Sequence, residues 1–227
     1  MFKDKKVHCL IPARGGSKGI KNKNIIEFCG SPLIYHSINQ SNNSRYIDEV
    51  FVSSDSDEIL RISKNCGATP VKRPPELSRD DSTSESAIEH FLHTSDCDFL
   101  IFLQATSPLR ETKDIDNAIE KFCNQKYDSL FSATEAQDFF VWNILNKQYK
   151  SLTYDFKNRQ RRQEINDLLL ENGSFYIFNR SMFLENRNRL FGKIGHYLMD
   201  RWKMHEIDSL SDLELCKFLH NNRIKNG

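Results

Sequence analysis

The chain has 227 residues, enough for one α/β domain with a sizeable core, and 38% of its residues are hydrophobic. Its 32 basic and 31 acidic residues give a net charge of +1, which argues against a general nucleic-acid binder, because such proteins usually carry a basic excess. We therefore interpret local clusters of basic residues as separate sites.

The six cysteines are widely scattered and form no CxxC pair, so the sequence gives no support to zinc or redox chemistry. The first sixteen residues contain only a short apolar run. We therefore expect neither a signal peptide nor a membrane span, and a reducing cytoplasm as the setting.

Apolar periodicity and turn residues predict that strands and helices alternate as far as residue 134. The predicted strands cover residues 7–11, 49–54, 68–72, 99–103 and 129–134. The predicted helices are 32–42, a helix capped by Asp55 and Ser56 that ends at Cys66, a helix after a Ser82–Glu85 capping box, and 112–123. This alternation indicates a three-layer α/β/α fold with a mostly parallel, Rossmann-like sheet.

The alternation breaks between residues 135 and 171, where aromatic residues precede a cationic run at 157–162. Regular structure is predicted to resume with strands at 173–178 and near 204–207, and with a final helix at about 211–220. The sequence shows neither an internal repeat nor a clear linker, so we expect a single domain over residues 1–227.

The stretch from Ile11 to Asn24 joins the first predicted strand to a loop rich in glycine and cations. Its glycines and cations are Gly15, Gly16 and Gly19 with Arg14, Lys18, Lys21 and Lys23. Glycine lets a polyanion approach the backbone N–H groups, and the cations supply the countercharge. The order of residues matches neither the dinucleotide fingerprint nor the P-loop. We predict that this loop binds phosphates.

A second polar loop, Gln104 to Arg110, follows the most apolar predicted strand. In a parallel sheet, ligands lie beyond the carboxyl ends of the strands. Both loops fall at such ends, so they are predicted to share one binding site.

A bound nucleoside triphosphate would require a metal ion, since Mg²⁺ bridges phosphate oxygens. The best candidate ligands are Glu206 and Asp208, because alternate residues of an extended chain point the same way. The alternative is an exposed pair of acids without a ligand.

The glycine-rich loop closely resembles the signature of the acylneuraminate cytidylyltransferases, the CMP-sialic acid synthetases. The matching elements are Ala13-Arg14, Ser17-Lys18-Gly19 and Lys23-Asn24. Further resemblance lies in Gln104 to Arg110, in Asn172-Gly173 with Tyr176, in Arg161-Arg162-Gln163, and in the segment from Arg73 to Ser84. The family usually has Asp-x-Asp where this chain has Glu206-Ile-Asp208, which puts the first metal ligand in doubt.

The resemblance implies a role for each matching residue. The implied nucleotide-binding residues are Arg14, Gly15, Ser17, Lys18, Lys23, Asn24, Arg73 and Ser84, of which Arg14, Lys18 and Lys23 act in catalysis with Asp208. The implied sugar-binding residues are Gln104, Arg162, Asn172 and Tyr176, and the implied Mg²⁺ ligands are Asp208 and Glu206. A guanidinium such as that of Arg162 suits the sugar carboxylate. Helix capping for Ser84 and a solvated basic turn for 157–162 stay open as structural alternatives.

The resemblance further implies transfer of CMP from CTP to the anomeric hydroxyl of a sialic-acid-like nonulosonic acid, with release of pyrophosphate. It implies a homodimer in which the extension at 135–170 packs on the partner subunit, and no nucleic-acid or membrane partner. The sequence shows no obvious catalytic base. The alternatives are a legionaminate or pseudaminate synthetase, a catalytically inactive nucleotide-binding protein, and an RNA-binding module that uses 157–162.

Overall fold

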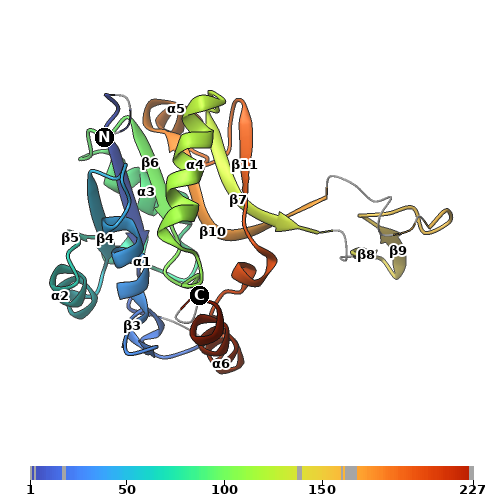
Figure 1. Ribbon diagram of the computed structural model, residues 1–227, viewed down its shortest axis with the longest axis horizontal. Coiled ribbons are helices and arrows are strands. Elements are labelled where there is room, and N and C mark those ends of the chain that lie inside the picture. The colour runs from blue at the N-terminus through green and yellow to red at the C-terminus, as the bar shows by residue number, and fades with distance from the viewer. Residues whose placement is uncertain are drawn as a thin grey trace.

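A seven-stranded sheet forms the centre of the fold (Figure 1). Its strands are β1 (Val7–Pro12), β4 (Glu49–Ser54), β5 (Thr69–Lys72), β6 (Phe99–Leu103), β7 (Ser129–Glu135), β10 (Leu169–Asn179) and β11 (Ile194–Leu198). The computed structural model describes residues 2, 4–16, 19–136, 140–159, 161 and 168–224. The strand order is β11-β7-β10-β6-β1-β4-β5. Strand β10 is antiparallel to β6 and β7, and the other neighbouring pairs of this sheet are parallel.

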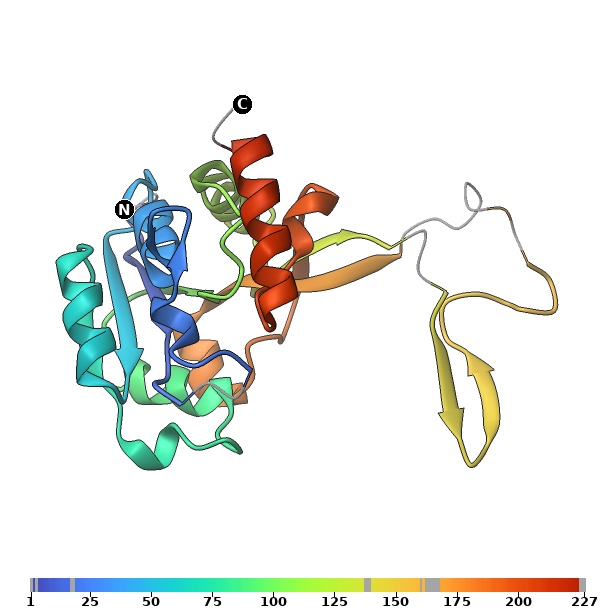
Figure 2. The same cartoon turned by 90° about the horizontal axis from the view of Figure 1, so that it is seen from below.

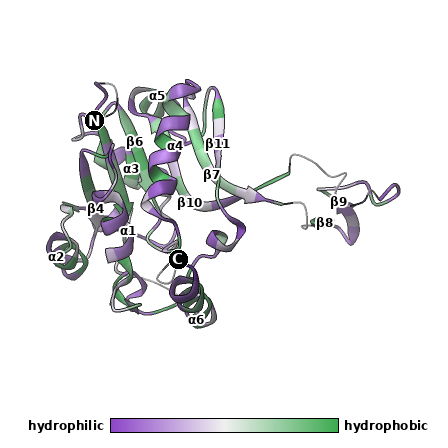
Figure 3. Ribbon diagram, viewed as in Figure 1, coloured by the Kyte–Doolittle hydropathy of each residue, from purple (hydrophilic) through white to green (hydrophobic). Residues whose placement is uncertain are grey.

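Helices cover both faces of the sheet. The helices are α1 (Leu33–Asn42), α2 (Asp57–Asn65), α3 (Ser84–Leu92), α4 (Thr112–Asn124), α5 (Arg180–Asn186) and α6 (Leu210–Leu219). One core cluster joins α1, α2 and α4 to side chains such as Cys9 and Ile101, and another joins α3 and α5 to Leu10 and Phe102. Adjacent strand residues thus face opposite layers. Figure 3 shows the hydrophobic residues concentrated in these strands. The predicted three-layer, mostly parallel fold is confirmed.

A third, smaller core cluster lies where α6 packs at the carboxyl ends of the strands (Figures 1 and 2). It joins Leu213 and Cys216 of α6 to Leu109 and Ile207, and to the short paired strands β2 (Glu27–Phe28) and β3 (Ser31–Pro32) through Phe28. This packing places α6 beside the loop that follows β6. None of the described helices is long and apolar enough to cross a membrane.

Most predicted elements are present, but one predicted strand and one predicted capping box are absent. Instead of a strand near 204–207, a short 3-10 helix (Arg201–Met204) precedes irregular chain. The capping box at Ser82 does not form: the cap of α3 is Thr83, whose hydroxyl accepts a hydrogen bond from the backbone N–H of Ser86 at 3.2 Å. The Ser82 hydroxyl instead accepts from the N–H of Arg79, and Glu85 pairs with Arg189.

The region where the alternation broke contains a hairpin that stands apart from the body of the molecule (Figures 1 and 2). Its strands are β8 (Trp142–Leu145) and β9 (Gln148–Ser151). Ile144, Leu145 and Tyr149 have exposed fractions of 62%, 69% and 67%. Exposed apolar side chains that cluster on one element often mark an interaction surface.

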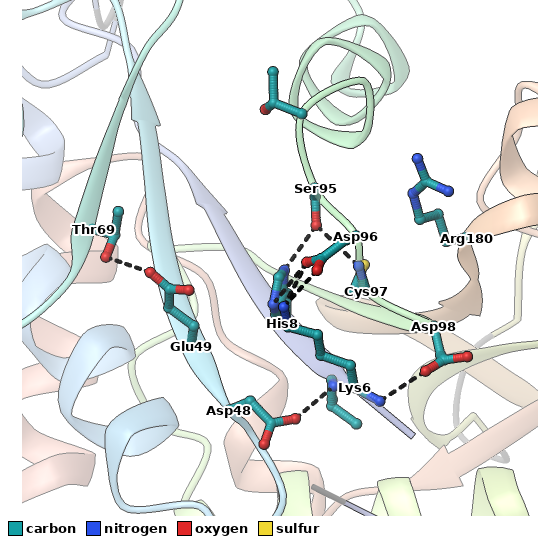
Figure 4. A network of polar contacts seen from close by, with 12 residues as sticks. Lys6, His8, Asp48, Glu49, Thr69, Ser95, Asp96, Cys97, Asp98 and Arg180 are labelled. Atoms are coloured by element: carbon teal, nitrogen blue, oxygen red, sulfur yellow. Dashed lines mark hydrogen bonds and ion pairs between the residues drawn. The ribbon is translucent and has the colours of Figure 1, made fainter. Parts of the chain in front are cut away.

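A polar network closes the amino ends of the central strands, opposite the loops discussed above (Figure 4). The ring of His8 is buried, its Nδ1 lies 2.7 Å from the Ser95 hydroxyl, and burial lowers its pKa. The carboxylate of Asp98 accepts hydrogen bonds from the Lys5 side chain and the Lys6 backbone. These bonds fix the chain entering β1 and β6, so we assign this edge a structural role.

A buried lysine ties the chain before Glu206 to the start of α4. The side chain of Lys203 is 1% exposed, and its Nζ lies 2.7 Å from Asp114 Oδ2 and 2.6 Å from Glu111 Oε2. Burial alone would lower the pKa of Lys203, but the bonds to Asp114 and Glu111 raise it above the ordinary value. The charged ammonium is therefore held in place by two acids.

We predict that Lys203→Met lowers the free energy of unfolding by about 3 kcal/mol, because Asp114 then remains buried without its countercharge. Chemical denaturation measures the loss. The double variant Lys203→Met, Asp114→Asn should recover part of it. Equal stability of the single variant and the wild type would contradict this role.

Candidate active site

Five chain segments meet at the carboxyl edge of the sheet. Strands β1, β4, β5 and β6 lie side by side, and their carboxyl ends lead to Arg14, Asp55, Arg73 and Gln104. Because β10 is antiparallel, its amino-terminal part, with Gly173, lies at the same edge. The two loops predicted to share a site are therefore brought together.

A pocket of about 510 Å³ opens between these loops. Its lining includes the predicted nucleotide-binding residues Arg14, Lys23, Asn24, Arg73 and Ser84, and also Asp208. The predicted residues Ser17 and Lys18 lie outside the described residues. Ser84 is the first residue of α3, and Thr83 rather than Ser84 caps that helix, so capping does not explain its place in the pocket.

The glycine-rich loop is held by hydrogen bonds from its neighbours. The Gly15 N–H donates to Asp55 Oδ1 at 2.9 Å, and Asn24 Nδ2 donates to the Arg14 carbonyl at 3.0 Å. An added Cβ at Gly19 would lie 2.5 Å from the carbonyl oxygen of Asp208. Glycine is required there by close packing. Asp55 is not the helix cap we predicted, since Ser56 caps α2 and Asp55 anchors this loop.

Three cations that line the pocket are each paired with an acid or a hydroxyl. Arg14 Nη1 lies 2.7 Å from Asp80 Oδ1, and Lys23 Nζ lies 2.7 Å from Asp208 Oδ1. Arg73 is 5% exposed and donates through Nε to the Ser78 hydroxyl at 2.9 Å, and burial lowers its pKa. Pairs that solvent reaches contribute about 0–1 kcal/mol each, so a triphosphate with several charges can displace them.

A second pocket, of about 320 Å³, lies on the other side of Glu206. It is lined by Leu170, Glu171, Asn172, Gly173, Tyr176, Met204 and Glu206. Two predicted sugar-binding residues, Asn172 and Tyr176, are thus together. The amide of Asn172 is also a structural anchor, because its Oδ1 accepts from the Ser132 hydroxyl at 2.6 Å and from the Ser174 N–H at 3.2 Å.

Gln104 lies beside this second pocket. Gly173 has a φ of +65°, which favours glycine, and an added Cβ there would lie 3.3 Å from Gln104 Nε2. The buried guanidinium of Arg110 holds the Gln104 carbonyl at 2.9 Å. The fourth predicted sugar-binding residue, Arg162, lies outside the described residues.

The segment Glu206-Ile207-Asp208 separates the two pockets. Ile207 is fully buried, and its N–H donates to the Thr106 carbonyl at 2.8 Å. Glu206 therefore faces the second pocket and Asp208 the first. Burial raises the pKa of Glu206, and the charge of Asp208 raises it further.

The two acids fit a hard divalent cation. Within the described ranges, no group of three or more His, Cys, Asp or Glu side chains is arranged to hold a metal. Mg²⁺ commonly binds one or two carboxylates and takes its other ligands from phosphates and water. Each carboxylate matches this preference in its chemistry. The two side chains face different pockets, however, so the prediction that they point the same way as alternate residues of an extended chain is wrong.

Several pocket residues were not predicted from the sequence. Asp80 and Arg79 line the first pocket, and Glu171 lines the second. Asp80 stands in the polar run Arg79-Asp80-Asp81, which resembles any exposed loop. Glu171 directly precedes Asn172, a predicted sugar-binding residue, and this adjacency could have indicated that Glu171 lies near the same pocket.

A sequence model described as cytidylyltransferase matches residues 8–224. The chain belongs to the cytidylyltransferase family. The predicted resemblance is confirmed, because relatives named N-acylneuraminate cytidylyltransferase are among its matches. The chain is therefore an enzyme of the cytidylyltransferase class.

Relatives with different names match this cytidylyltransferase. Post-translational flagellin modification protein B of Campylobacter coli is 36% identical over 223 residues, which cover 93% of each chain. A pseudaminic acid cytidylyltransferase of Campylobacter jejuni is 34% identical over 93% of this chain and 95% of its own length. N-acylneuraminate cytidylyltransferase of Oncorhynchus mykiss is 37% identical over 85% of this chain, which spans 45% of that relative.

Solved structures share the fold of the cytidylyltransferase. A CMP:2-keto-3-deoxy-manno-octonic acid synthetase complexed with CTP has a TM-score of 0.74 at 14% identity, over 96% of this chain and 100% of that one. A 4-diphosphocytidyl-2C-methyl-D-erythritol synthase from Anaerococcus prevotii has a TM-score of 0.71 at 12% identity, over 96% and 99% of the two chains. At these identities the likeness concerns the fold alone.

We predict that Glu206→Gln makes the cytidylyltransferase more stable at pH 7. The raised pKa means that the folded state disfavours the charged carboxylate, so the stability this group contributes is lost as pH rises through its pKa. The gain in urea midpoint should therefore shrink as the pH approaches 4. Glu58→Gln, at an exposed position on α2, should show no such gain. A variant less stable than the wild type at pH 7 would contradict the assignment.

We predict that Asp80→Asn lowers the KM for CTP about two- to fivefold, because Arg14 no longer has a competing carboxylate. Steady-state kinetics with varied CTP measures the change. Asp81→Asn is the matched control, since Asp81 is exposed and does not line the pocket. An unchanged KM in Asp80→Asn, or an equal change in both variants, would refute the idea that Asp80 competes with CTP for Arg14.

Proposed function

We propose that the enzyme is a CMP-nonulosonate synthetase, which transfers CMP from CTP to the anomeric hydroxyl of a nine-carbon keto acid and releases pyrophosphate. One observation carries the proposal. Two pockets, one lined by cations and one by hydrogen-bonding groups, share the wall that bears Glu206 and Asp208. A transfer between two substrates needs such adjacent sites, because positioning supplies most of its acceleration.

The nucleotide occupies the larger pocket in this proposal. Arg14, Lys18 and Lys23 bind the triphosphate and stabilise the departing pyrophosphate, and Gly15 and Ser17 belong to the same nucleotide-binding loop. Asn24 keeps the loop in shape through the Arg14 carbonyl. Arg73 and Ser84, which also line this pocket, bind the rest of the nucleotide.

The sugar occupies the smaller pocket, against Gln104, Asn172 and Tyr176, with Arg162 binding its carboxylate. Asp208 and Glu206 hold Mg²⁺. The ion would neutralise phosphate charge and make the attacking hydroxyl more acidic, which meets the need for a catalytic base. Lys23 pairs with Asp208 at 2.7 Å, and with Asp208 as a metal ligand its ammonium group would be available to the phosphates.

Sialic acid is the first candidate for the sugar, and pseudaminic acid has equal support. The relatives named for pseudaminic acid match over nearly their whole length, and those named for N-acylneuraminate match over about half of theirs. Legionaminic acid is a further candidate of the same chemical class. A panel of the three acids, assayed singly with CTP, ranks them by kcat/KM.

A homodimer in the cytoplasm completes the proposal. The exposed apolar side chains of the β8–β9 hairpin would be buried against a second copy of the chain, with residues 135–170 as the dimerisation extension. Apolar residues shielded in this way are typical of subunit interfaces.

We predict that Arg14→Ala lowers kcat/KM for CTP at least about 100-fold, because a charged donor to the phosphates is lost. Pyrophosphate release from CTP plus a nine-carbon acid, with and without Mg²⁺, measures turnover. The thermal midpoint should stay within a few degrees, since Arg14 makes only solvent-reached contacts. Lys21→Ala, an exposed position on the same loop that does not line the pocket, should keep near-normal turnover. Near-normal turnover of Arg14→Ala would refute its role.

A further inference from the structure

Two acids and no cation line the described part of the smaller pocket. Glu206 has a role there as a metal ligand in the proposed function, but Glu171 has none. A second carboxylate is unexpected in a site for an anionic sugar, because like charges repel at short range. Its presence restricts how such a sugar can lie in the pocket.

A backbone irregularity places Glu171 in this pocket. Residues five apart in a regular strand face opposite sides of the sheet, so Glu171 and Tyr176 would normally point apart. Strand β10 shifts its register against β7 between these two residues, and Gly173 within the shift has a φ of +65°. The bulge therefore brings both side chains to one pocket. Bulges often redirect side chains next to active sites.

Tyr176 fixes one oxygen of the Glu171 carboxylate. The Tyr176 hydroxyl donates to Glu171 Oε1. The Tyr176 ring is 5% exposed, and the guanidinium carbon of Arg189 lies 4.8 Å from its centroid. Arg189 is itself held by Glu85, with Nη2 2.7 Å from Oε1. Burial and then the bond to Glu171 raise the pKa of Tyr176, so its hydroxyl remains a donor.

An ionised carboxylate only accepts hydrogen bonds, at about four lone-pair sites. One donor, Tyr176, leaves Glu171 with capacity for more, and its side chain is exposed at the pocket. A ligand beside it would be favoured if it presented an N–H or O–H group. A carboxylate on the same ligand would be turned away from Glu171.

We propose that Glu171 determines substrate specificity by accepting a hydrogen bond from a donor on the sugar, an acylamino N–H or a side-chain hydroxyl. Its charge also orients the sugar, with the sugar carboxylate pointing away from Glu171. The inference rests on the proposed function, since it assumes that the smaller pocket holds the sugar. It adds a residue that selects among nine-carbon acids.

The test measures discrimination, not activity alone. N-acetylneuraminic acid and pseudaminic acid are each compared with two analogues, one with hydrogen in place of an acylamino group and one with hydrogen in place of a side-chain hydroxyl. The wild type should prefer one parent over the analogue that lacks the donor by about tenfold or more in kcat/KM, because the analogue leaves a carboxylate unpaired. The analogue whose kcat/KM falls relative to its parent identifies the donor group that Glu171 binds.

In Glu171→Ala this preference should fall to within about twofold, with the KM for CTP unchanged. Glu171→Gln, which keeps an acceptor oxygen, should retain most of the preference for the parent sugar. Tyr176→Phe removes the internal bond but leaves the carboxylate, so the preference should persist even if overall activity falls.

If Glu171→Ala lowered kcat/KM equally for parents and analogues, Glu171 would have a structural role and the inference would be overturned. Turnover by the wild type would still support the proposed function. A wild type inactive with every nine-carbon acid would overturn the proposed function and this inference together.

Discussion

The site depends on how the chain between Lys203 and Asp208 is pinned. Ile207 is buried and bound through its N–H to the Thr106 carbonyl, and Lys203 is anchored between two acids at the start of α4. Residues 205–208 have no regular secondary structure, so these contacts determine the path of the backbone there. They place one carboxylate at each pocket, and they do so at the cost of burying Glu206. Such a stability cost at a functional site is common in enzymes.

Charge pairs link the acids and cations of the larger pocket. The carboxylate of Asp80 pairs with Arg14, and the carboxylate of Asp208 pairs with Lys23. The pairs are partly solvated and therefore weak, so a triphosphate and a metal ion can exchange with them. In the proposed function, substrate binding would separate these acids from the cations and leave Asp208 available to a metal ion.

Much of this fold could be predicted from the sequence because local signals agreed with the packing. Strand β4 and helix α1 follow directly from apolar periodicity, and the place of the glycine-rich loop follows from the end of the first predicted strand. The failures have physical causes. The Ser82 hydroxyl was taken by the neighbouring loop, and Asp55 bound a glycine N–H rather than its own helix. The place of Glu171 depends on a register shift against β7, a long-range feature that no local pattern encodes.

The central claim is that Glu206 and Asp208 bring a divalent ion to the boundary between two substrate pockets. A crystal structure with CTP, Mg²⁺ and a nine-carbon acid tests it most directly. We predict an ion about 2.1 Å from a carboxylate oxygen of Asp208, with the triphosphate against Arg14 and Lys23 moved from the acid to the phosphates. An ion bound away from both acids, or a triphosphate outside the larger pocket, would contradict the claim.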